Sequence, residues 1–427
     1  MMKGWSRSTL GELCKNQNGK IQTGPFGSQL HQSDYVDDGI PVVMPKDINQ
    51  QGIDLSSVAK ISAETAERLS RHKLHKDEIV FPRRGEITKC ALIKQEQEGF
   101  LCGTGCLKIT VPAKALNPLF FRYYLAKKEI IEWLDGNAVG ATMKNLSTGI
   151  LQKLPVVYPA LPIQKKIAGI LSAYDDLIEN NLKRIKLLEE MAQITYEEWF
   201  VRLRFPGHKT TPINPETGLP EGWRMGTMQD LFDFKNGYAF KSGTYVQDGQ
   251  HKIVTIKNVQ DGSFIPDTTD TIAELPSNIK AHHHLSTGDI IMSLTGNVGR
   301  VCLVYGENYL LNQRVAKVVP NIPADRLYVY TLLRSRGTLT QLENISNGAA
   351  QQNLSPVNAS KMPALVPARN VLNDFNKNIG SIIDLICLKN IENNRLREAR
   401  DILLPRLMTG VIDVESYDPA QLLKEAA

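Results

Sequence analysis

Residues 163–200 read IQKKIAGILSAYDDLIENNLKRIKLLEEMAQITYEEWF, a stretch without proline that contains a single glycine, Gly169. Apolar or small residues recur in it at alternating steps of four and three, with Asn181 and Thr195 as the polar exceptions. The positions are Ile167, Leu171, Tyr174, Ile178, Asn181, Ile185, Leu188, Ala192, Thr195 and Trp199. This spacing is typical of a long helix whose narrow apolar seam faces a partner helix. At 1.5 Å per residue, a helix of about 38 residues is about 57 Å long.

A second helix with similar spacing is predicted near the end of the chain, from about Leu372 to Leu404. Its seam positions are Phe375, Ile379, Ile382, Ile386, Leu396, Leu403 and Leu407. Lys389, Asn393 and Arg400 interrupt the seam, so we expect the second helix to be the poorer partner. Pro405 is expected to end or kink it, because proline has no N–H to donate.

We expect the two helices to pair with each other, antiparallel, rather than each to pack only on its own domain. Residues 205–222 lie between the first helix and the second domain, and their proline, glycine and threonine content indicates a linker that turns the chain back. An asparagine in a seam costs stability but fixes register. We therefore expect Asn181 to face Asn393 or Asn394.

The chain contains the same pattern twice. Trp5 matches Trp223, 218 positions later, and Gly140 to Ser147 (GATMKNLS) matches Gly348 to Ser355 (GAAQQNLS), 208 positions later. The matches keep one order along the chain, which indicates a tandem duplication. In each copy, short β-like runs separated by turn residues precede short helical stretches, which predicts an α/β or α+β domain.

The composition is that of a globular protein. The 427 residues include 50 Lys and Arg against 45 Asp and Glu, a formal net charge of +5 that permits nucleic-acid binding without requiring it. The sequence contains no apolar run of about 18 residues and no leader-like start, so we expect a cytoplasmic protein without a membrane partner. The six cysteines have no zinc-site spacing, and we expect His282, His283 and His284 to form a solvated loop, so no metal site is predicted.

Several segments resemble the specificity subunit of type I restriction–modification systems. They are LPIQKKIAGILSAYDDLIENN (161–181), ILLPRLMTG (402–410), the twin openings WSRSTLGEL (5–13) and WRMGTMQDLFDFKNGYAFKS (223–242), and TGPFGSQLHQSDYVDDGIPVVMPKDI (23–48). The order of parts matches that family over essentially the whole chain. The resemblance implies an α/β (α+β) fold with two similar target recognition domains separated by two long antiparallel helices that form a coiled-coil spacer, a pseudo-twofold tandem repeat.

The expected parts follow from this resemblance. They are a first recognition domain (1–158), a central spacer helix (159–204), a linker (205–222), a second recognition domain (223–368), a distal spacer helix (369–409) and a C-terminal tail (410–427). The residues expected to pair the spacer helices are Leu171, Tyr174, Ile178, Asn181, Ile185, Leu188, Ile379, Ile382, Ile386, Asn393, Leu396 and Leu403.

The resemblance also implies a function. Each recognition domain reads one half of a bipartite, asymmetric site in double-stranded DNA, and the helices dock two adenine methyltransferase subunits. Those partners carry S-adenosylmethionine, and a restriction or translocase subunit that uses ATP and magnesium can join them. No cofactor is expected in this chain, and a prokaryotic cytoplasm is its expected location.

Two loops at equivalent positions carry different side chains, as sequence-reading loops should. They are PRRGEITK (82–89) and SLTGNVGR (293–300). Arg83 or Arg84 can contact guanine or phosphate, and Asn297 can read adenine. The basic Lys89 and Arg300 are expected to contact phosphate. The remaining DNA-binding candidates are Lys20, Ser28, Lys46, Lys241, Ser242, Lys257, Thr295, Gln313, Arg314 and Gln351.

Some residues near these DNA-binding candidates are expected to have structural roles instead. The aromatic residues Phe26 and Phe240 are expected to pack in the core rather than to intercalate. Asn145 and Asn353, each followed by Leu-Ser, are expected to orient a turn.

Two other classes of function remain as alternatives. One is a stand-alone divergent nuclease or methyltransferase, although the sequence contains neither an NPPY-like loop nor a GxxxxGK[ST] motif. The duplicated frame also does not keep the acidic residues that a metal-dependent nuclease needs, because Asn297 takes the place of Glu86. The other is a structural adaptor that uses the paired helices for protein assembly.

Overall fold

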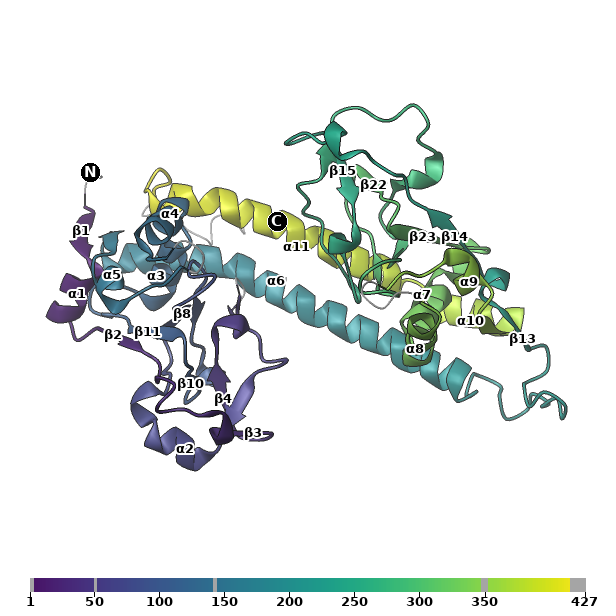
Figure 1. Cartoon of the computed structure of the whole chain (residues 1–427), viewed down its shortest axis with the longest axis horizontal. Helices are drawn as coiled ribbons and strands as arrows, with labels where there is room; N and C mark the ends of the chain where they lie inside the picture. The colour runs from purple at the N-terminus through teal and green to yellow at the C-terminus, as the bar shows by residue number, and fades with distance from the viewer. Residues whose placement is uncertain (1–3, 50–51, 141–143, 347–351, 415–427) are drawn as a thin grey trace, which may run out of the picture. The chain divides into compact units, whose positions relative to one another are not determined.

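The computed structural model describes residues 4–49, 52–140, 144–346 and 352–414. The chain forms two compact units. The first unit holds the described residues up to Asp176 together with those from Arg397 onward, and the second unit holds Leu177–Leu396. Two long helices, α6 (Leu161–Tyr196) and α11 (Ile382–Met408), contribute to both units (Figure 1).

The first domain is built on two four-stranded sheets. In spatial order, one consists of β2 (Lys20–Thr23), β11 (Cys106–Thr110), β8 (Ile79–Pro82) and β9 (Ala91–Leu92), and the other of β10 (Leu101–Cys102), β4 (Ile40–Val43), β7 (Ala59–Ile61) and β3 (Tyr35–Val36). Two smaller pairs are β1 (Ser6–Thr9) with β12 (Pro155–Tyr158), and β5 (Ile48–Asn49) with β6 (Gly52–Ile53). All pairs are antiparallel except β4 with β10.

Strand β8 explains the apolar run at its position in the sequence. Ile79 and Phe81 enter one core cluster, and Val80 enters another on the opposite face. A strand buried on both faces has no polar positions to alternate with, so the run is continuous. The domain's helices are α1 (Leu10–Asn16), α2 (Ala63–Arg68), α3 (Pro118–Leu125), α4 (Lys128–Asn137) and α5 (Thr148–Gln152).

The second domain repeats this plan, which confirms the duplication. Its sheets are β14 (Phe232–Asn236), β23 (Val315–Pro320), β20 (Ile290–Ser293) and β21 (Val301–Leu303), and β18 (Thr271–Ile272), β15 (His251–Val254), β22 (Tyr309–Leu311) and β19 (His284–Leu285). The smaller pairs are β13 (Arg224–Thr227) with β24 (Pro363–Val366), and β16 (Val259–Gln260) with β17 (Ser263–Phe264). Its helices are α7 (Arg326–Arg334), α8 (Arg336–Asn344), α9 (Pro356–Ser360) and α10 (Arg369–Ile379).

Within the second unit, α6 pairs with the distal helices in antiparallel fashion. The Asn181 Nδ2 atom donates to Asn393 Oδ1 at 3.0 Å, and in the turn that follows α6 the ring of Trp199 lies 5.6 Å from that of Phe375. Both asparagines are buried, with exposed fractions of 3% and 0%. Of the two facing partners expected for Asn181, the structure therefore places Asn393 against it.

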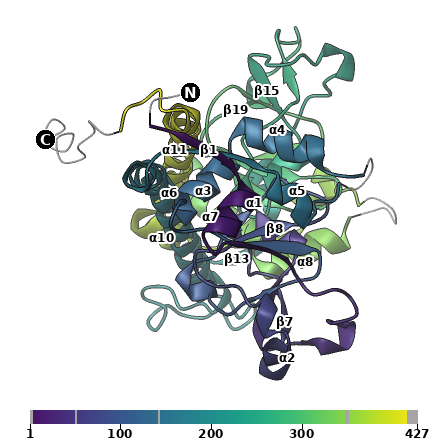
Figure 2. The ribbon, with the colours of Figure 1, turned by 90° about the vertical axis from the view of Figure 1, so that its left-hand side faces the viewer.

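The first unit shows the same direction of pairing. Arg400 of α11 donates to Asp175 of α6, and Lys166 Nζ lies 3.2 Å from the carbonyl oxygen of Val414. Asp175 also accepts a hydrogen bond from Tyr123 of the first recognition domain. Arg400, which interrupts the apolar pattern in sequence, thus faces an acidic residue. The views in Figure 1 and Figure 2 both show α6 and α11 side by side.

The expected pairing residues lie on the helix faces that are at least half-buried. Leu171, Ile178, Asn181, Ile382, Ile386 and Asn393 are buried, and Tyr174, Ile185, Leu188, Ile379, Leu396 and Leu403 are half-buried. Near its end, α6 also enters the core of the second domain, because the Tyr196 ring lies 5.8 Å from that of Tyr328. Helix pairing and packing on the domain therefore occur together.

The helix boundaries differ from the sequence prediction at three places. The distal helix is not continuous, because Gly380 and Ser381 separate α10 from α11, and glycine weakens a helix interior by about 1 kcal/mol relative to alanine. The prediction that Pro405 can end the helix is wrong, since α11 continues to Met408. Pro405 lies in the last turn, where the loss of one N–H removes a single hydrogen bond. Helix α6 is followed by a π-helical turn, Glu197–Val201.

Candidate nucleic-acid interface

Three loops of the first domain meet beside the carboxyl end of β8. The Arg83 N–H donates to the Gly105 carbonyl at 2.6 Å, and the Gly24 N–H donates to the Cys106 carbonyl at 2.9 Å. A Cβ atom on Gly24 would lie 2.1 Å from the carbonyl oxygen of Gly103, so this position requires glycine. The loop 83–89 is therefore locked to the segment that follows β2.

The basic residues of this loop have different surroundings. Arg84 is exposed, whereas Arg83 is half-buried and its guanidinium carbon lies 5.9 Å from the centre of the Phe26 ring. Lys89 is half-buried and pairs with Glu86 at 2.6 Å. Arg83 and Arg84 are thus placed together, while the charge of Lys89 is already paired within the loop.

The equivalent loop of the second domain is held by its own side chains. The Ser293 hydroxyl accepts a hydrogen bond from the Arg300 N–H at 3.1 Å, and the Arg300 guanidinium donates to Gln260 and to the Asn297 side-chain oxygen. Asn297 is exposed, and Thr295 is half-buried. Arg300, expected at a phosphate, therefore contacts the base-reading candidate Asn297.

The Asn-Leu-Ser segments, which are expected to orient a turn, support both loops. In the first domain, the Leu146 N–H donates to the Arg83 carbonyl at 2.8 Å. In the second, the Leu354 N–H donates to the Leu294 carbonyl at 2.8 Å. The Asn-Leu-Ser sequence, which occurs in both domains, is the sequence signal for this shared backbone hydrogen bond. Gln351 lies outside the described residues.

The remaining candidates are surface residues. Lys46 and Lys257 occupy equivalent short helical turns, in which Asp47 and Asn258 accept from the backbone N–H groups of Met44 and Thr255 at 2.9 Å. Lys46 Nζ also donates to the Ser57 carbonyl at 3.0 Å. The exposed positions are Lys20, Ser28, Lys46, Lys241, Ser242, Lys257, Gln313 and Arg314.

The chain matches the model of one protein family in both of its domains. The model of the type I restriction modification DNA specificity domain matches residues 2–190 and again residues 220–396. Each match contains one recognition domain and part of a long helix. The chain belongs to this family.

Proteins similar to this chain over most of its length include specificity subunits of type I restriction enzymes. The type I restriction enzyme HindI specificity subunit of Haemophilus influenzae is 21% identical, and the match covers 96% of this chain and 100% of that protein. The MjaIX specificity subunit of Methanocaldococcus jannaschii is 24% identical, with 90% of this chain and 89% of that protein covered. The crystal structure of a type I restriction-modification system S subunit from M. genitalium shares the fold, with a TM-score of 0.56, 17% identity and coverage of 94% and 96%.

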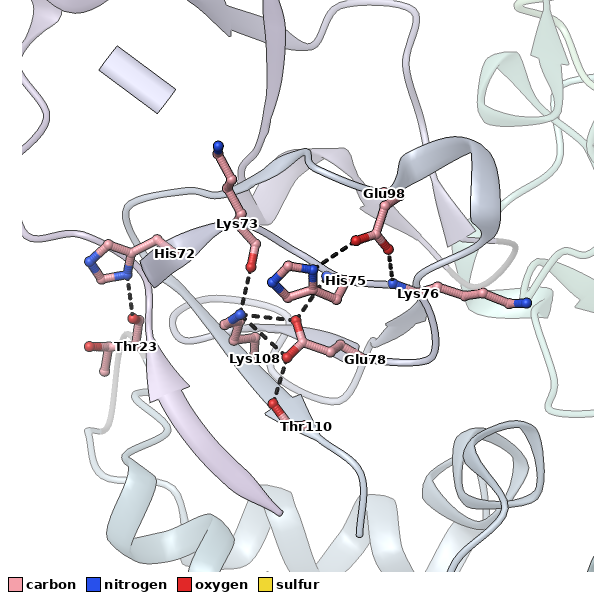
Figure 3. A network of polar contacts seen from close by, with 9 residues as sticks. All are labelled: Thr23, His72, Lys73, His75, Lys76, Glu78, Glu98, Lys108 and Thr110. Atoms are coloured by element: carbon pink, nitrogen blue, oxygen red, sulfur yellow. Dashed lines mark hydrogen bonds and ion pairs between the residues drawn. The ribbon is translucent and has the colours of Figure 1, made fainter. Parts of the chain in front are cut away.

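An ion pair supports the sheet of this specificity chain in each domain, and the pair of the first domain is buried. Lys108 Nζ lies 3.0 Å from Glu78 Oε2, and both side chains are 5% exposed (Figure 3). Lys317 Nζ lies 2.6 Å from Asp289 Oδ2 in the second domain, where the side chains are 17% and 20% exposed. In each domain the acidic residue directly precedes a strand, β8 or β20, and the lysine lies on the neighbouring strand, β11 or β23. The pairs therefore have a structural role.

Further contacts hold the neighbouring turns of the first domain. Glu78 accepts from the His75 N–H at 3.0 Å and from the Thr110 hydroxyl. Hydrogen bonds from the His75 ring and the Lys76 N–H hold the pKa of Glu98 below its usual value. His72 Nδ1 lies 3.0 Å from the Thr23 carbonyl, just before Gly24, as Figure 3 shows. The network thus connects the sheet to the segment that carries Phe26.

The histidine triplet of the specificity chain differs from the prediction of a solvated loop. His283 is buried, and its Nδ1 atom accepts a hydrogen bond from the Lys280 N–H at 2.9 Å. Burial lowers the pKa of His283, as expected for a ring that caps a turn. Within the part of the chain that the structure describes, no group of three or more His, Cys, Asp or Glu side chains is arranged to hold a metal ion.

Two further findings concern thiols and membranes. All six cysteines are buried free thiols, and burial raises the pKa of Cys14 to about 11. Across the described ranges, every helix is too short or too polar to cross a bilayer.

Proposed function

We propose that this chain is the DNA-reading subunit of a type I restriction–modification complex, in which each recognition domain reads one half of a split, asymmetric target. The observation that carries the proposal is that both domains have a loop at the same position but with different side chains. Arg83 and Arg84 in the first domain correspond to Leu294 and Thr295 in the second. Phosphate contacts position a protein on the duplex and base contacts specify sequence, so different loop tips read different bases.

The paired helices are proposed to fix the spacing between the half-sites. Helix α6 has 36 residues and is therefore about 54 Å long. Polar contacts at the seam, such as Asn181 with Asn393, hold one register. A fixed register is required if the number of unread base pairs between the half-sites is to be constant.

A second face of α6 supports the docking of adenine methyltransferase subunits. Leu187, Met191 and Ile194 are between 46% and 63% exposed. Their spacing of four and three places them on one stripe, separate from the seam that meets α11. Exposed apolar stripes of this kind mark interaction sites. Two methyltransferase subunits, which would carry S-adenosylmethionine, are the proposed occupants.

The chain itself is proposed to supply recognition and no chemistry. Its partners would supply methyl transfer and, when a restriction or translocase subunit joins, ATP- and magnesium-dependent cleavage, all in a prokaryotic cytoplasm. The alternatives are a stand-alone nuclease or methyltransferase and a protein adaptor that does not bind DNA.

Binding and activity assays separate these functions. Purified chain, with and without its methyltransferase subunit, is titrated with duplex DNA at several salt concentrations. A steep loss of affinity with rising salt is expected for a DNA reader and not for an adaptor. Methylation or cleavage by the chain alone, with S-adenosylmethionine or magnesium, would contradict the proposal.

The docking stripe is tested by replacing Met191 and Ile194 together with Ser. Methyltransferase co-purification and adenine methylation should fall at least tenfold while thermal unfolding stays unchanged, because both side chains are exposed. Leu55→Ser, at a 47% exposed position of the first domain, is the matched control and should affect neither. Unchanged co-purification of the double variant would exclude this stripe as the docking site.

A further inference from the structure

Phe26 is an exposed aromatic side chain in a rigid turn. The sequence predicts that it packs in the core, but its exposed fraction is 53%. The Phe26 N–H donates to the Gln29 side chain at 3.2 Å, and its carbonyl accepts from the N–H groups of Gln29 and Leu30 at 2.8 and 3.2 Å. Gly24, two positions before Phe26, lies close against the backbone of Gly103. The backbone on both sides of Phe26 is therefore fixed while the ring remains on the surface.

Arg83 is held beside this ring on three sides. Its N–H donates to Gly105 and its carbonyl accepts from Leu146. Its guanidinium carbon lies 5.9 Å from the Phe26 ring centre, within the range of cation–π attraction. The Arg83 Nε atom is buried and has no hydrogen-bond partner among the described residues.

The second domain has no such pair. Leu294, at the position of Arg83, is 5% exposed and lies in the core. Phe240, at the position of Phe26, is half-buried and its ring packs 4.8 Å from that of Tyr238. At these equivalent positions, the pair of an exposed aromatic ring and an arginine thus occurs in the first domain and not in the second. This difference is expected of a contact that distinguishes one half-site from the other.

We propose that Phe26 and Arg83 act as one specificity-determining element, which reads a guanine and the adjacent thymine in the first half-site. This inference rests on the proposed function. Arg83 would donate two hydrogen bonds to guanine O6 and N7, which is the arginine contact that best specifies a base. Phe26 would contact the neighbouring thymine methyl group and keep the guanidinium plane fixed. A phosphate contact would need charge but no exposed aromatic ring, so the geometry favours base reading.

The test is selection from a randomised duplex library by the full chain in complex with its methyltransferase subunit. The variants are Phe26→Ala, Phe26→Leu and Arg83→Lys, and folding is checked by thermal unfolding. The matched controls are Val36→Ala, an exposed apolar residue of the same domain, and Lys128→Ala, whose side chain is 87% exposed. Phe26→Leu and Arg83→Lys keep the test decisive if Phe26→Ala does not fold.

We expect Arg83→Lys to reduce the preference for guanine at one position by about 5- to 150-fold, the range for a bidentate base contact. Phe26→Ala should reduce the preference at that position and the adjacent one, and both controls should leave them unchanged. The second half-site and the slope of affinity against salt should stay the same in every variant. Uniform weakening over all sequences, with the preference for guanine unchanged, would assign Arg83 to phosphate and overturn the inference. Unchanged selection would also overturn it, whereas a wild-type chain that selects no split site would contradict the proposed function instead.

Discussion

Asn181 and Asn393 form a buried side-chain hydrogen bond between the central and distal helices, with 3.0 Å between Asn181 Nδ2 and Asn393 Oδ1. The two residues lie within one compact unit and are separated by 212 positions in sequence. Glu392 is adjacent, and Lys389 binds it at 2.7 Å. The polar residues that weaken the distal seam in sequence thus have polar partners in the structure.

Asn181→Leu should destabilise the helix pair by about 1–3 kcal/mol, because it leaves the buried Asn393 amide without its partner. Replacing both asparagines with leucine should recover most of this stability but loosen the register. Hydrogen exchange of the α6 and α11 amides measures both effects. A single variant with wild-type protection and wild-type methyltransferase binding would show that the hydrogen bond does not set the alignment.

Lys108→Met should cost the first domain about 3–5 kcal/mol, since it leaves Glu78 charged in a buried site. The equivalent Lys317→Met should cost less, closer to the scale of about 1 kcal/mol for exposed pairs, because Asp289 is more accessible to water. Hydrogen exchange of the β8 and β20 amides compares the two domains within one chain. Equal losses in both domains would contradict the structural difference.

Acidification should destabilise the first domain through His72. Burial, followed by the nearby charge of Arg71, lowers the pKa of His72 below its ordinary value of 6.5. The unfolded state then binds the proton more readily than the folded state, so stability falls as the pH drops through about 6.5 and levels off below the folded pKa. The loss cannot exceed about 1.4 kcal/mol per pH unit for one proton.

The measurement is the stability of the first domain between pH 7.5 and 5 in the wild type and in His72→Asn. The difference between the two should shrink as the pH falls, because only the wild type loses the contribution of a neutral ring that bonds Thr23 and Arg71. His31→Asn, at an exposed position of the same domain, is the control. A constant difference would indicate that His72 does not titrate in this range.

The repeated plan and the helix pair were predictable because their signals are periodic. The four-three spacing identifies Ile178 and Asn181 as seam residues without knowledge of what they contact. The partner of Arg400 was not predictable, because Asp175 lies far away in sequence and off the apolar seam. The break at Gly380 was missed because a single glycine leaves the periodicity intact on both sides.

The loops were predictable only in position. Matching strands place residues 83–89 and 294–300 at the same site, but side-chain contacts are decided by tertiary packing. Lys89 and Arg300 are both basic and aligned, yet each is held by a neighbour in its own loop or sheet. Phe26 carries no sequence signal for exposure, because an aromatic residue after a strand is usually buried.

Domain exchange with mapping of methylated adenines tests the central claim, that each recognition domain independently reads half of a split target. A host carries this chain with its methyltransferase subunit, or the same chain with residues 1–158 replaced by the equivalent region of a relative that has another target. The account predicts a split motif in which the exchange alters one half and leaves the other half and the spacing unchanged. An exchange that alters both halves, or a modified motif that is not split, would contradict it.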